Sequence, residues 1–359
     1  KGYSVDVYYR SADSAVVKEN IGSLINQDRY NTSYLYGIPG PGLESTLKQP
    51  ILRKIETFFY TAFRGDRSYH WAKNVVGYIK EHSQNFDRVY CFFTPRGPIL
   101  AGFNLKKLQP KIKLIIDLQD ELHEGINLWF RRLSMLWAKF KLRNADVIST
   151  VSPEWAMMVQ NLMSKEIQCI RHAVPQIKQI ENLSVDKSNY LNLIYYGSID
   201  FDKQNPEMLI DTSQVNIKFF YAGNENISNT FKSHCKSKNI SFKYLGWLNS
   251  AQLRDGIETS NAVVVFLWQH TGRQVVPSKV YEALALHKPI LLVGADTGAI
   301  RVLLNEWGHK DVVLDTQAKV DNCLSKMLDE DYSDCLDIEN CKSVLFEDKI
   351  VDYFEHYLK

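Results

Sequence analysis

The chain has 359 residues, of which 45% are hydrophobic and 23% charged, so it can form about two domains and lacks the composition of a disordered protein. Its 43 Lys and Arg residues nearly balance 41 Asp and Glu residues, and the net charge of +2 excludes a general attraction to nucleic acid. The longest apolar runs are far shorter than the roughly 20 residues that cross a bilayer, so we expect no membrane-spanning helix.

The predicted elements alternate between strands and helices along the whole chain. Runs rich in β-branched and aromatic residues predict strands over residues 4–9, 88–93, 113–118, 146–151, 167–171, 191–196, 217–222, 241–245, 262–267, 289–293 and 311–314. Amphipathic stretches predict helices over residues 69–81, 127–143, 153–163, 251–258 and 278–286. This order is typical of α/β folds with parallel sheets.

A polar, aperiodic segment at residues 173–190 predicts a linker between two domains. We therefore expect two Rossmann-like, doubly wound domains that face one another across a cleft, at residues 1–175 and 176–345, with ligands at the carboxyl ends of the strands. The chain opens on KGYSVDVYYR, a turn into a strand, without the strand and Gly-rich loop that usually begin such a sheet. We expect about 20 to 30 residues to precede it, with part of the active site.

The spacing of the cysteines and histidines argues against metal and triad chemistry. The six cysteines form neither a Cys-x2-Cys pair nor a zinc-finger spacing with histidine, so they predict reduced structural thiols in a cytoplasmic protein. Four histidines have no carboxylate or serine partner at a recognisable spacing, which argues against a hydrolytic triad; they are His70, His82, His172 and His287.

The first candidate binding segment is YYGSIDFDKQNPEMLI, residues 195–210. Gly197 lets the backbone turn closely after a predicted strand, and Lys203 precedes an apolar stretch that predicts a helix. Free N–H groups at a helix start and a nearby lysine together suit a phosphate group. A solvated loop with an exposed lysine would show the same pattern.

The second candidate segment is PSKVYEALALHKP, residues 277–289, in which Ser278 and Lys279 stand at a helix start. A lysine in the first turn opposes the helix dipole by a few tenths to about 1 kcal/mol, a cost that an anionic ligand would offset. Glu282 is suited to accept hydrogen bonds from two neighbouring hydroxyls of a sugar ring. Alternatively, Ser278 is only an N-cap and Glu282 only a favourable first-turn charge.

Several motifs, taken in order, resemble those of the retaining GT-B glycosyltransferases of family 4, which use nucleotide sugars. They are KLIIDLQDELHE at 113–124, NADVISTVSPEW at 144–155, the Gly-x-Ile-x3-Lys turn at 197–203, GWL at 246–248 and the PSK-x2-Glu helix start. Residues 346–359 resemble the terminal helix that returns to the first domain. The resemblance implies sugar transfer from a UDP- or GDP-linked donor to a glycan or lipid-linked acceptor, in bacterial surface polysaccharide synthesis.

The resemblance also implies roles for the positions that match. Lys203 matches the family lysine on the donor diphosphate, Gly197 matches the turn beside it, and Glu282 matches the glutamate that contacts the nucleotide ribose. We expect Lys203 to stabilise the negative charge on the departing diphosphate. No Asp-x-Asp motif stands at a strand end in the second domain, so we expect transfer without a metal ion or other cofactor.

Two positions depart from the family pattern. Gln274 stands where the family has the first glutamate of a Glu-x7-Glu signature, and Ser198 stands where it has an arginine. We expect Arg273 and Lys279 to supply the missing positive charge at the donor site, which Ser198 and Ser278 also line.

Asp120 and the loop TPRG, residues 94–97, both follow predicted strands and should line the floor of the cleft. Asp120 resembles the acidic residue of a related turn, which implies acceptor binding or polarisation. An N-cap for the following helix is the alternative.

Residues 125–144 hold five cations and no acid; the cations are Arg131, Arg132, Lys139, Lys141 and Arg143. Such a basic, aromatic helix can lie in a lipid headgroup plane, which would place the enzyme at the inner face of the membrane with a lipid-linked acceptor. Alternatively, an apolar stripe buries against the sheet, and this is the interpretation that we favour. The stripe would consist of Trp129, Leu133, Leu136, Trp137 and Phe140.

Two other functions share the expected architecture. One is a non-catalytic nucleotide-sugar-binding partner, since Ser198 and Gln274 could mark an eroded catalytic site. The other is a nucleotide-sugar epimerase, for which the sequence offers no convincing acid–base pair. No Gly-x-Gly-x2-Gly follows a predicted strand, which argues against a dinucleotide oxidoreductase.

Overall fold

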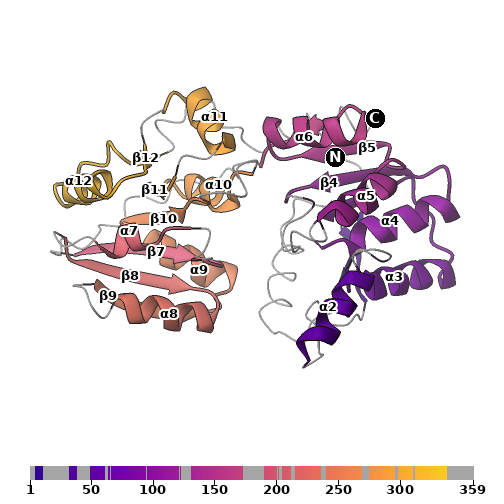
Figure 1. The fold of residues 1–359 in the computed structure, drawn as a ribbon, viewed down its shortest axis with the longest axis horizontal. Helices are drawn as coiled ribbons and strands as arrows, with labels where there is room; N and C mark the ends of the chain where they lie inside the picture. The colour runs from indigo at the N-terminus through magenta and orange to yellow at the C-terminus, as the bar shows by residue number, and fades with distance from the viewer. Residues whose placement is uncertain are drawn as a thin grey trace. The chain divides into compact units, whose positions relative to one another are not determined.

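The computed structural model describes residues 5–10, 32–38, 49–60, 64, 66–93, 95–120, 122, 131–172, 190–199, 201, 204–211, 215–235, 240–268, 275–295, 298–309 and 312–337. The chain divides into two compact units, Lys1–Ile170 and Arg171–Lys359, slightly before the boundary expected at residue 175. Each unit contains its own parallel sheet and helices (Figure 1). Most of the expected linker and the whole expected terminal helix at 346–359 lie outside the described residues.

The first unit contains a four-stranded parallel sheet in the order β3-β4-β5-β6. Its strands are β3 (Arg88–Phe93), β4 (Lys113–Leu118), β5 (Val147–Thr150) and β6 (Gln168–Cys169). Its helices are α3 (Tyr69–Glu81), α4 (Gly97–Leu108), α5 (Arg131–Leu142) and α6 (Pro153–Met163). In β4, five consecutive residues are buried, which explains why this strand is a continuous apolar run broken by one aspartate.

Two further strands, β1 (Val5–Arg10) and β2 (Thr32–Ile38), pair in parallel as a separate sheet of the first unit. Ile38 is buried in the core of the unit, and Tyr8 packs edge-on against Tyr78 of α3 with ring centroids 6.5 Å apart. Helix α2 (Pro50–Phe59) follows β2. Neither β2 nor α2 is among the predicted elements; in β2, Gly37 interrupts the apolar run.

Helix α5 buries a different face from the one expected. Trp137 is buried, as predicted, together with Ser134 and Ala138. The prediction was wrong for Leu136 and Phe140, whose side chains are 65% and 47% exposed. With 3.6 residues per turn, these two positions fall on the side of the helix opposite the buried arc. The part of the predicted stripe before residue 131 lies outside the described residues.

The second unit contains a six-stranded parallel sheet in the order β12-β11-β10-β7-β8-β9. Its strands are β7 (Leu191–Tyr196), β8 (Ile217–Ala222), β9 (Ile240–Gly246), β10 (Ala262–Phe266), β11 (Ile290–Val293) and β12 (Val313–Leu314). Counted from β7, this is the 3-2-1-4-5-6 order of the doubly wound Rossmann fold, with the reversal between β7 and β10. The doubly wound architecture is therefore confirmed for this unit.

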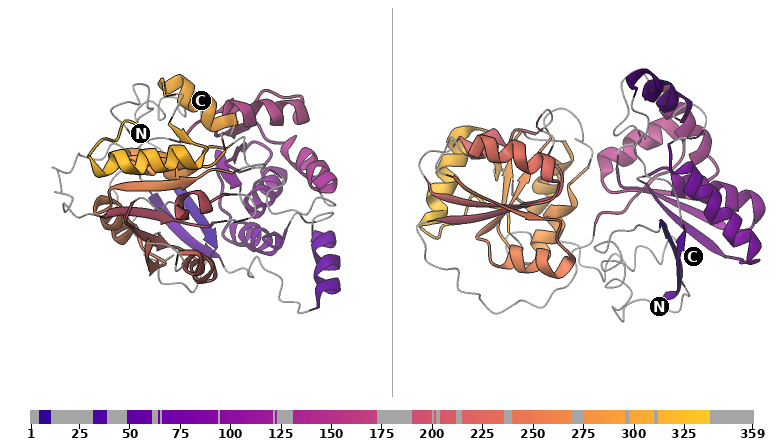
Figure 2. Two further views of the ribbon diagram at one scale, coloured as in Figure 1. Left: turned by 60° about the vertical axis from the view of Figure 1, so that its left-hand side comes forward. Right: turned by 90° about the horizontal axis from the view of Figure 1, so that it is seen from below.

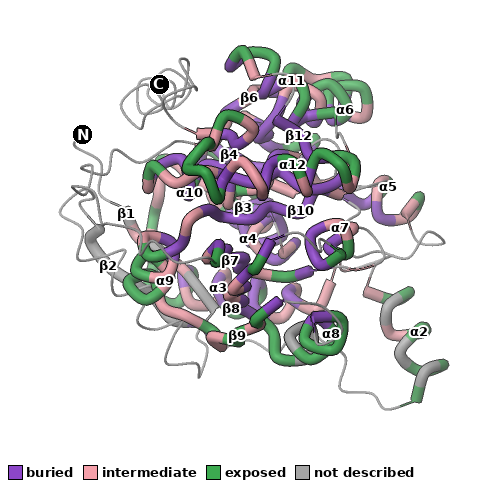
Figure 3. Tube along the Cα trace, turned by 90° about the vertical axis from the view of Figure 1, so that its left-hand side faces the viewer, coloured by how far each residue is buried: buried purple, intermediate pink, exposed green. Residues whose placement is uncertain are grey.

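Alternate residues of each strand enter two apolar layers. In β7, Ile194 and Tyr196 pack with the layer of α9 (Ser250–Glu258), α10 (Ser278–Ala285) and α11 (Gly298–Trp307). Leu193 and Tyr195 pack with the opposite layer, which contains α7 (Glu207–Ile210), α8 (Glu225–Cys235) and α12 (Gln317–Leu328). The sheet thus lies between two helix layers (Figure 2), and its central strands are the most deeply buried segments (Figure 3).

Among the helices in the described ranges, none combines the length and the apolar character that a bilayer crossing requires.

Candidate functional site

Glycines line the carboxyl edge of the second sheet. Gly197 and Gly223 directly follow β7 and β8, and Gly246 ends β9. A Cβ on Gly223 would lie 2.6 Å from the carbonyl oxygen of Gly197, so only glycine fits there. The N–H of Gly197 donates to Ala222 and that of Gly223 to Gly246, both at 2.9 Å, which holds the strand ends together. Parallel α/β sheets bind ligands at this edge, where the strand order reverses.

Lys279, in the first turn of α10, packs directly against Gly197. A Cβ on Gly197 would lie 3.1 Å from both Cε and Nζ of Lys279. Because glycine has no side chain, the Lys279 ammonium can lie close to the backbone at this position. Nζ lies 5.1 Å from the ring centroid of Tyr195 and 6.0 Å from that of Tyr196, within cation–π range. Burial lowers the pKa of Lys279, and the Glu282 carboxylate acts in the opposite direction. The ammonium has no hydrogen bond or ion pair within the part of the chain that the structure describes.

Three tyrosines fix the loops that carry these glycines. Their hydroxyls donate to backbone carbonyls: Tyr195 to Ser198 (2.5 Å), Tyr221 to Gly197 (3.0 Å) and Tyr244 to Gly223 (2.8 Å). The ring of Tyr221 stacks between the other two, at centroid distances of 6.1 and 6.0 Å. Burial raises the pKa of Tyr221 to about 12, so its hydroxyl stays a donor at neutral pH. The loops are therefore held rigidly for a ligand.

Glu282 lies on α10 one turn after Ser278 and is exposed. Its carboxylate is near the phenol of Tyr196, the last residue of β7. Burial raises the pKa of Tyr196, and the negative charge of Glu282 raises it further. The Tyr196 hydroxyl is buried and has no hydrogen-bond partner among the described residues. An exposed carboxylate near Tyr196 and Lys279 can accept hydrogen bonds from ligand hydroxyls.

Helix α10 begins at Ser278, as predicted, but the N-cap position belongs to Pro277. The interpretation of Ser278 as an N-cap was therefore wrong; its side chain is exposed. Pro277 makes no side-chain hydrogen bond to the helix start. Within the residues that the structure describes, the first N–H groups of α10 are therefore not capped by the N-cap residue and are suited to an anionic ligand.

Part of the predicted donor site, Lys203 and residues 273–274, lies outside the described residues. Gln204, the next residue after Lys203, is buried and donates from Nε2 to the carbonyl of Phe266 at 2.8 Å. Its backbone also pairs with Trp268 in an isolated bridge. These two contacts attach the segment at Gln204, which follows β7 in the chain, to the end of β10. Strands β7 and β10 are the neighbours between which the strand order reverses. Gln204 is not among the predicted site residues, because a glutamine within a polar loop has no periodic signal.

Trp247 is a second residue at this edge that is not among the predicted site residues. It directly follows β9 and is 65% exposed. An exposed indole at a ligand-binding edge is suited to stack on a planar base. The GWL motif contained the signal, since a large aromatic residue directly after a predicted strand and a glycine is unusual for a solvated turn.

In the first unit, β4 holds a buried carboxylate three residues before Asp120 in the chain. Asp120 is half-buried and lies two residues after the end of β4. Asp117, inside β4, is buried and accepts hydrogen bonds from the Ser149 hydroxyl at 2.7 Å and from Gln119 Nε2 at 3.0 Å. Burial and the Asp117 charge raise the pKa of Tyr90 on the neighbouring strand β3. This cluster is not among the predicted sites, because Asp117 stands within an apolar run that predicts only a buried strand.

The TPRG loop follows β3, but the expectation that it lines a ligand site was wrong for Arg96. Its side chain is only 3% exposed and donates to the carbonyl of Leu122 at 2.7 Å and to the hydroxyl of Ser134. The guanidinium also lies over the ring of Trp137 at 5.0 Å. Burial lowers the pKa of Arg96 to about 10, against the opposing effect of Asp66. Arg96 therefore anchors α5 inside the first unit.

Four of the described histidines contact aromatic rings: His70, His82, His172 and His234. His70 shares a hydrogen bond of 2.9 Å with the Tyr60 hydroxyl, and the ring of His172 packs edge-on against Tyr281 with centroids 5.3 Å apart. Across the described ranges, no group of three or more His, Cys, Asp or Glu side chains is placed to hold a metal ion.

Solved structures resemble the fold of this chain, although no protein-family model and no curated protein match the sequence. TarM aligns with a TM-score of 0.57 over 80% of this chain and 58% of its own, at 12% sequence identity. UGT89C1 from Arabidopsis thaliana, complexed with UDP, aligns with a TM-score of 0.50 over 99% of this chain and 92% of its own, at 13% identity. The chain has the GT-B fold of glycosyltransferases.

A variant of TarM from S. aureus, in complex with fondaparinux, alpha-GlcNAc-glycerol and UDP, aligns with a TM-score of 0.56 at 11% identity. It matches 79% of this chain and 58% of its own, so the present chain spans little more than half the length of TarM. The predicted GT-B fold class is thus confirmed. Membership of glycosyltransferase family 4 stays a prediction.

Proposed function

We propose that the protein is a retaining hexosyltransferase that moves a sugar from a UDP- or GDP-linked donor to a glycan or lipid-linked acceptor. The observation that carries the proposal is the ammonium of Lys279, packed against Gly197 at the reversal of strand order without a hydrogen bond or ion pair in the described part of the chain. A cation taken out of water is costly, and a donor diphosphate at this position would offset that cost. The UDP bound in UGT89C1 and in the TarM variant supports the choice of a nucleotide.

In this proposal, different residues bind the diphosphate, the ribose and the base of the donor. Lys203, Lys279 and the first N–H groups of α10 bind the diphosphate and stabilise the charge that develops on it as the sugar leaves, with Arg273 as an additional cation. Glu282 accepts hydrogen bonds from the ribose hydroxyls, and Trp247 stacks on the base. Asp120, at the end of a strand in the first unit, binds or polarises the acceptor hydroxyl. We assign the protein to the synthesis of bacterial surface polysaccharides, in the cytoplasm.

A non-catalytic nucleotide-sugar-binding protein is the second candidate. Ser198 and Gln274 both replace charged residues of the family pattern, and Ser198 is exposed and contributes its carbonyl to the Tyr195 contact. Such a protein would bind the donor but would not cleave it.

The two candidates differ in one measurement. Binding of UDP or GDP at about 100 times its dissociation constant should stabilise the second unit by about 2.7 kcal/mol, read as a shift in thermal unfolding. An enzyme will in addition release free nucleotide from a nucleotide sugar, faster when acceptor is present. Binding without release would favour the second candidate, and the absence of binding to any nucleotide sugar would contradict both.

We expect transfer to continue in the presence of EDTA. The positive charges that meet the departing diphosphate come from lysine and arginine side chains in this proposal, so removal of divalent cations should change turnover by less than about twofold. Nucleotide release with and without EDTA, followed by readdition of Mg²⁺ or Mn²⁺, measures this directly. Abolished release that the metal restores would contradict metal-independent transfer.

A further inference from the structure

The solvent-facing side of α5 combines cations with apolar side chains. Its exposed residues are spaced so that they share one face of the helix, an arc of about 100° at 3.6 residues per turn. They are Arg132, Leu136, Lys139 and Phe140 of α5 together with Arg143, which directly follows the helix. Leu136 lies inside this arc and Phe140 at one edge of it, and both are exposed, although burial was the expected outcome for both.

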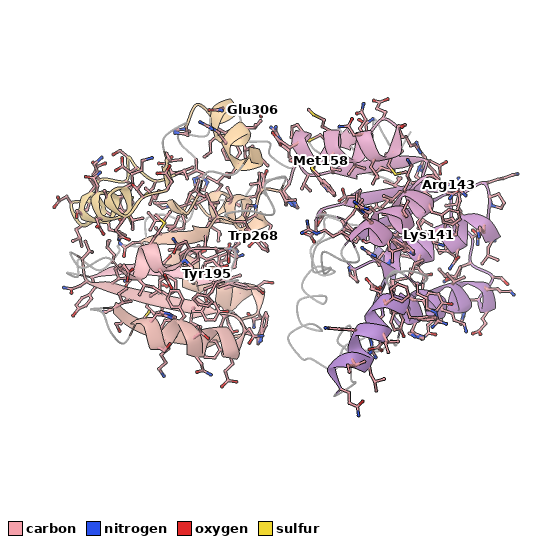
Figure 4. The ribbon with its side chains drawn as sticks, viewed as in Figure 1. Lys141, Arg143, Met158, Tyr195, Trp268 and Glu306 are labelled. Atoms are coloured by element: carbon pink, nitrogen blue, oxygen red, sulfur yellow. The ribbon has the colours of Figure 1, made fainter. Side chains whose placement is uncertain are left out.

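The same surface continues onto the end of α4 through aromatic contacts. Phe103 of α4 lies 6.3 Å from Phe140 between ring centroids, and the ammonium groups of Lys107 and Lys141 lie 4.4 and 4.1 Å from the Phe103 ring. The guanidinium of Arg143 lies 4.2 Å from the Phe140 ring. We call this set the α5 basic face: the exposed residues named above, with Lys141 and Lys107. Figure 4 labels Lys141 and Arg143 at the end of α5.

The charge of the α5 basic face is not neutralised by the described residues. Neither α4 nor α5 contains an acidic residue, and none of the five cations of the face forms an ion pair within the described ranges. Lys106, one position before Lys107, shows the contrast, because it pairs with Asp146 at 2.8 Å. Burial lowers the pKa of Lys141, and the neighbouring charge of Lys107 lowers it further. Like charges are thus held close together, and an anionic partner would reduce the repulsion between them.

We infer that the α5 basic face docks on an anionic lipid bilayer, with the helix axis in the plane of the membrane. Leu136 and Phe140 would enter the boundary between headgroups and acyl chains, while the long Lys and Arg side chains around them reach the lipid phosphates. A second copy of the chain is a poor partner, since two faces of the same sign repel each other. An acidic protein would satisfy the charges but gives no reason for two apolar side chains that stand exposed next to the cations.

Flotation of the full chain with vesicles tests this inference. We expect binding to phosphatidylcholine vesicles that contain phosphatidylglycerol, weak binding to phosphatidylcholine alone, and loss of most binding at high salt. Each cation near an anionic surface changes the affinity about fivefold, so the double variant Lys139→Glu/Arg143→Glu should bind at least about 25-fold more weakly. The variant Leu136→Ser/Phe140→Ser should bind about tenfold more weakly.

Matched controls use exposed residues on other helices. Lys73→Glu/Lys80→Glu on α3 makes the same charge change, and Leu328→Ser on α12 removes an apolar side chain that is 41% exposed. Both should float like the wild type, and all variants should keep the wild-type thermal shift with UDP, which reports the donor site independently. Equal flotation of the α5 and control variants, binding to phosphatidylcholine alone at wild-type strength, or capture of an acidic protein in place of vesicles would overturn the inference.

Discussion

Replacement of Lys279 with methionine should weaken UDP binding about 10- to 100-fold and at the same time raise the melting temperature of the second unit. The loss of affinity follows from the removal of a charge-assisted hydrogen bond to the diphosphate. The gain in stability follows because the free protein carries an ammonium whose charged form burial disfavours, and methionine fills the same space without charge. Calorimetric titration with UDP and thermal unfolding of the same samples measure both effects.

The pH dependence of the wild type should have the same origin. Because the pKa of Lys279 is lowered in the folded protein, the unfolded chain binds more protons between the folded and unfolded pKa values, and stability rises with pH through that window. UDP affinity should change in the opposite direction, falling as the pH rises through the lowered pKa, since a neutral amine attracts the diphosphate far less. Both dependences should be absent in Lys279→Met.

Lys288 offers a matched control in the same unit. Burial lowers its pKa too, but its ammonium donates to the carbonyl of Ser260 at 2.8 Å. Lys288→Met should therefore leave UDP affinity unchanged and should not stabilise the protein, because it leaves that carbonyl without its donor. If the two methionine variants behaved alike, the unpaired charge of Lys279 would not be what binds the nucleotide.

Lys203→Ala should lower turnover by about two to three orders of magnitude. In the proposed reaction Lys203 meets charge that grows on the diphosphate as the sugar leaves, so its removal affects the transition state more than the bound donor. We expect the Michaelis constant for the donor to change much less than turnover. Nucleotide release at saturating donor and acceptor measures the effect.

Lys232→Ala, on the exposed face of α8, is the control for a general loss of positive charge and should have wild-type turnover. A Lys203→Ala enzyme with unchanged turnover would remove this lysine from the catalytic machinery. The loss of donor binding with turnover intact at saturation would make it a binding residue only.

The strands were the most predictable part of this fold. Strands such as β3, β4, β7 and β8 match their predicted ranges, because β-branched and aromatic residues concentrate where both faces of a parallel sheet are covered. Helix α5 was predicted less well. The sequence shows which residues are apolar, but which arc of a helix meets its neighbours depends on tertiary packing, here through Ser134 and Ala138.

The candidate site also contains residues that a local sequence signal predicts and residues that have no such signal. Gly197 and Lys279 were predicted because a glycine after a strand and a lysine at a helix start each have a local signal. Their contact across α10 and β7 could not be predicted, since it joins residues far apart in the chain. Gln204 and Asp117 had no local signal, and both act through hydrogen bonds to neighbouring strands or turns.

The most direct test of the account is a crystal structure of the protein with UDP. We expect the diphosphate to lie beside Gly197, within hydrogen-bonding distance of Lys279 Nζ and of the first N–H groups of α10. We expect the Glu282 carboxylate to accept hydrogen bonds from the ribose hydroxyls. A nucleotide bound at another edge of the sheet, with Lys279 still unpaired, would contradict it.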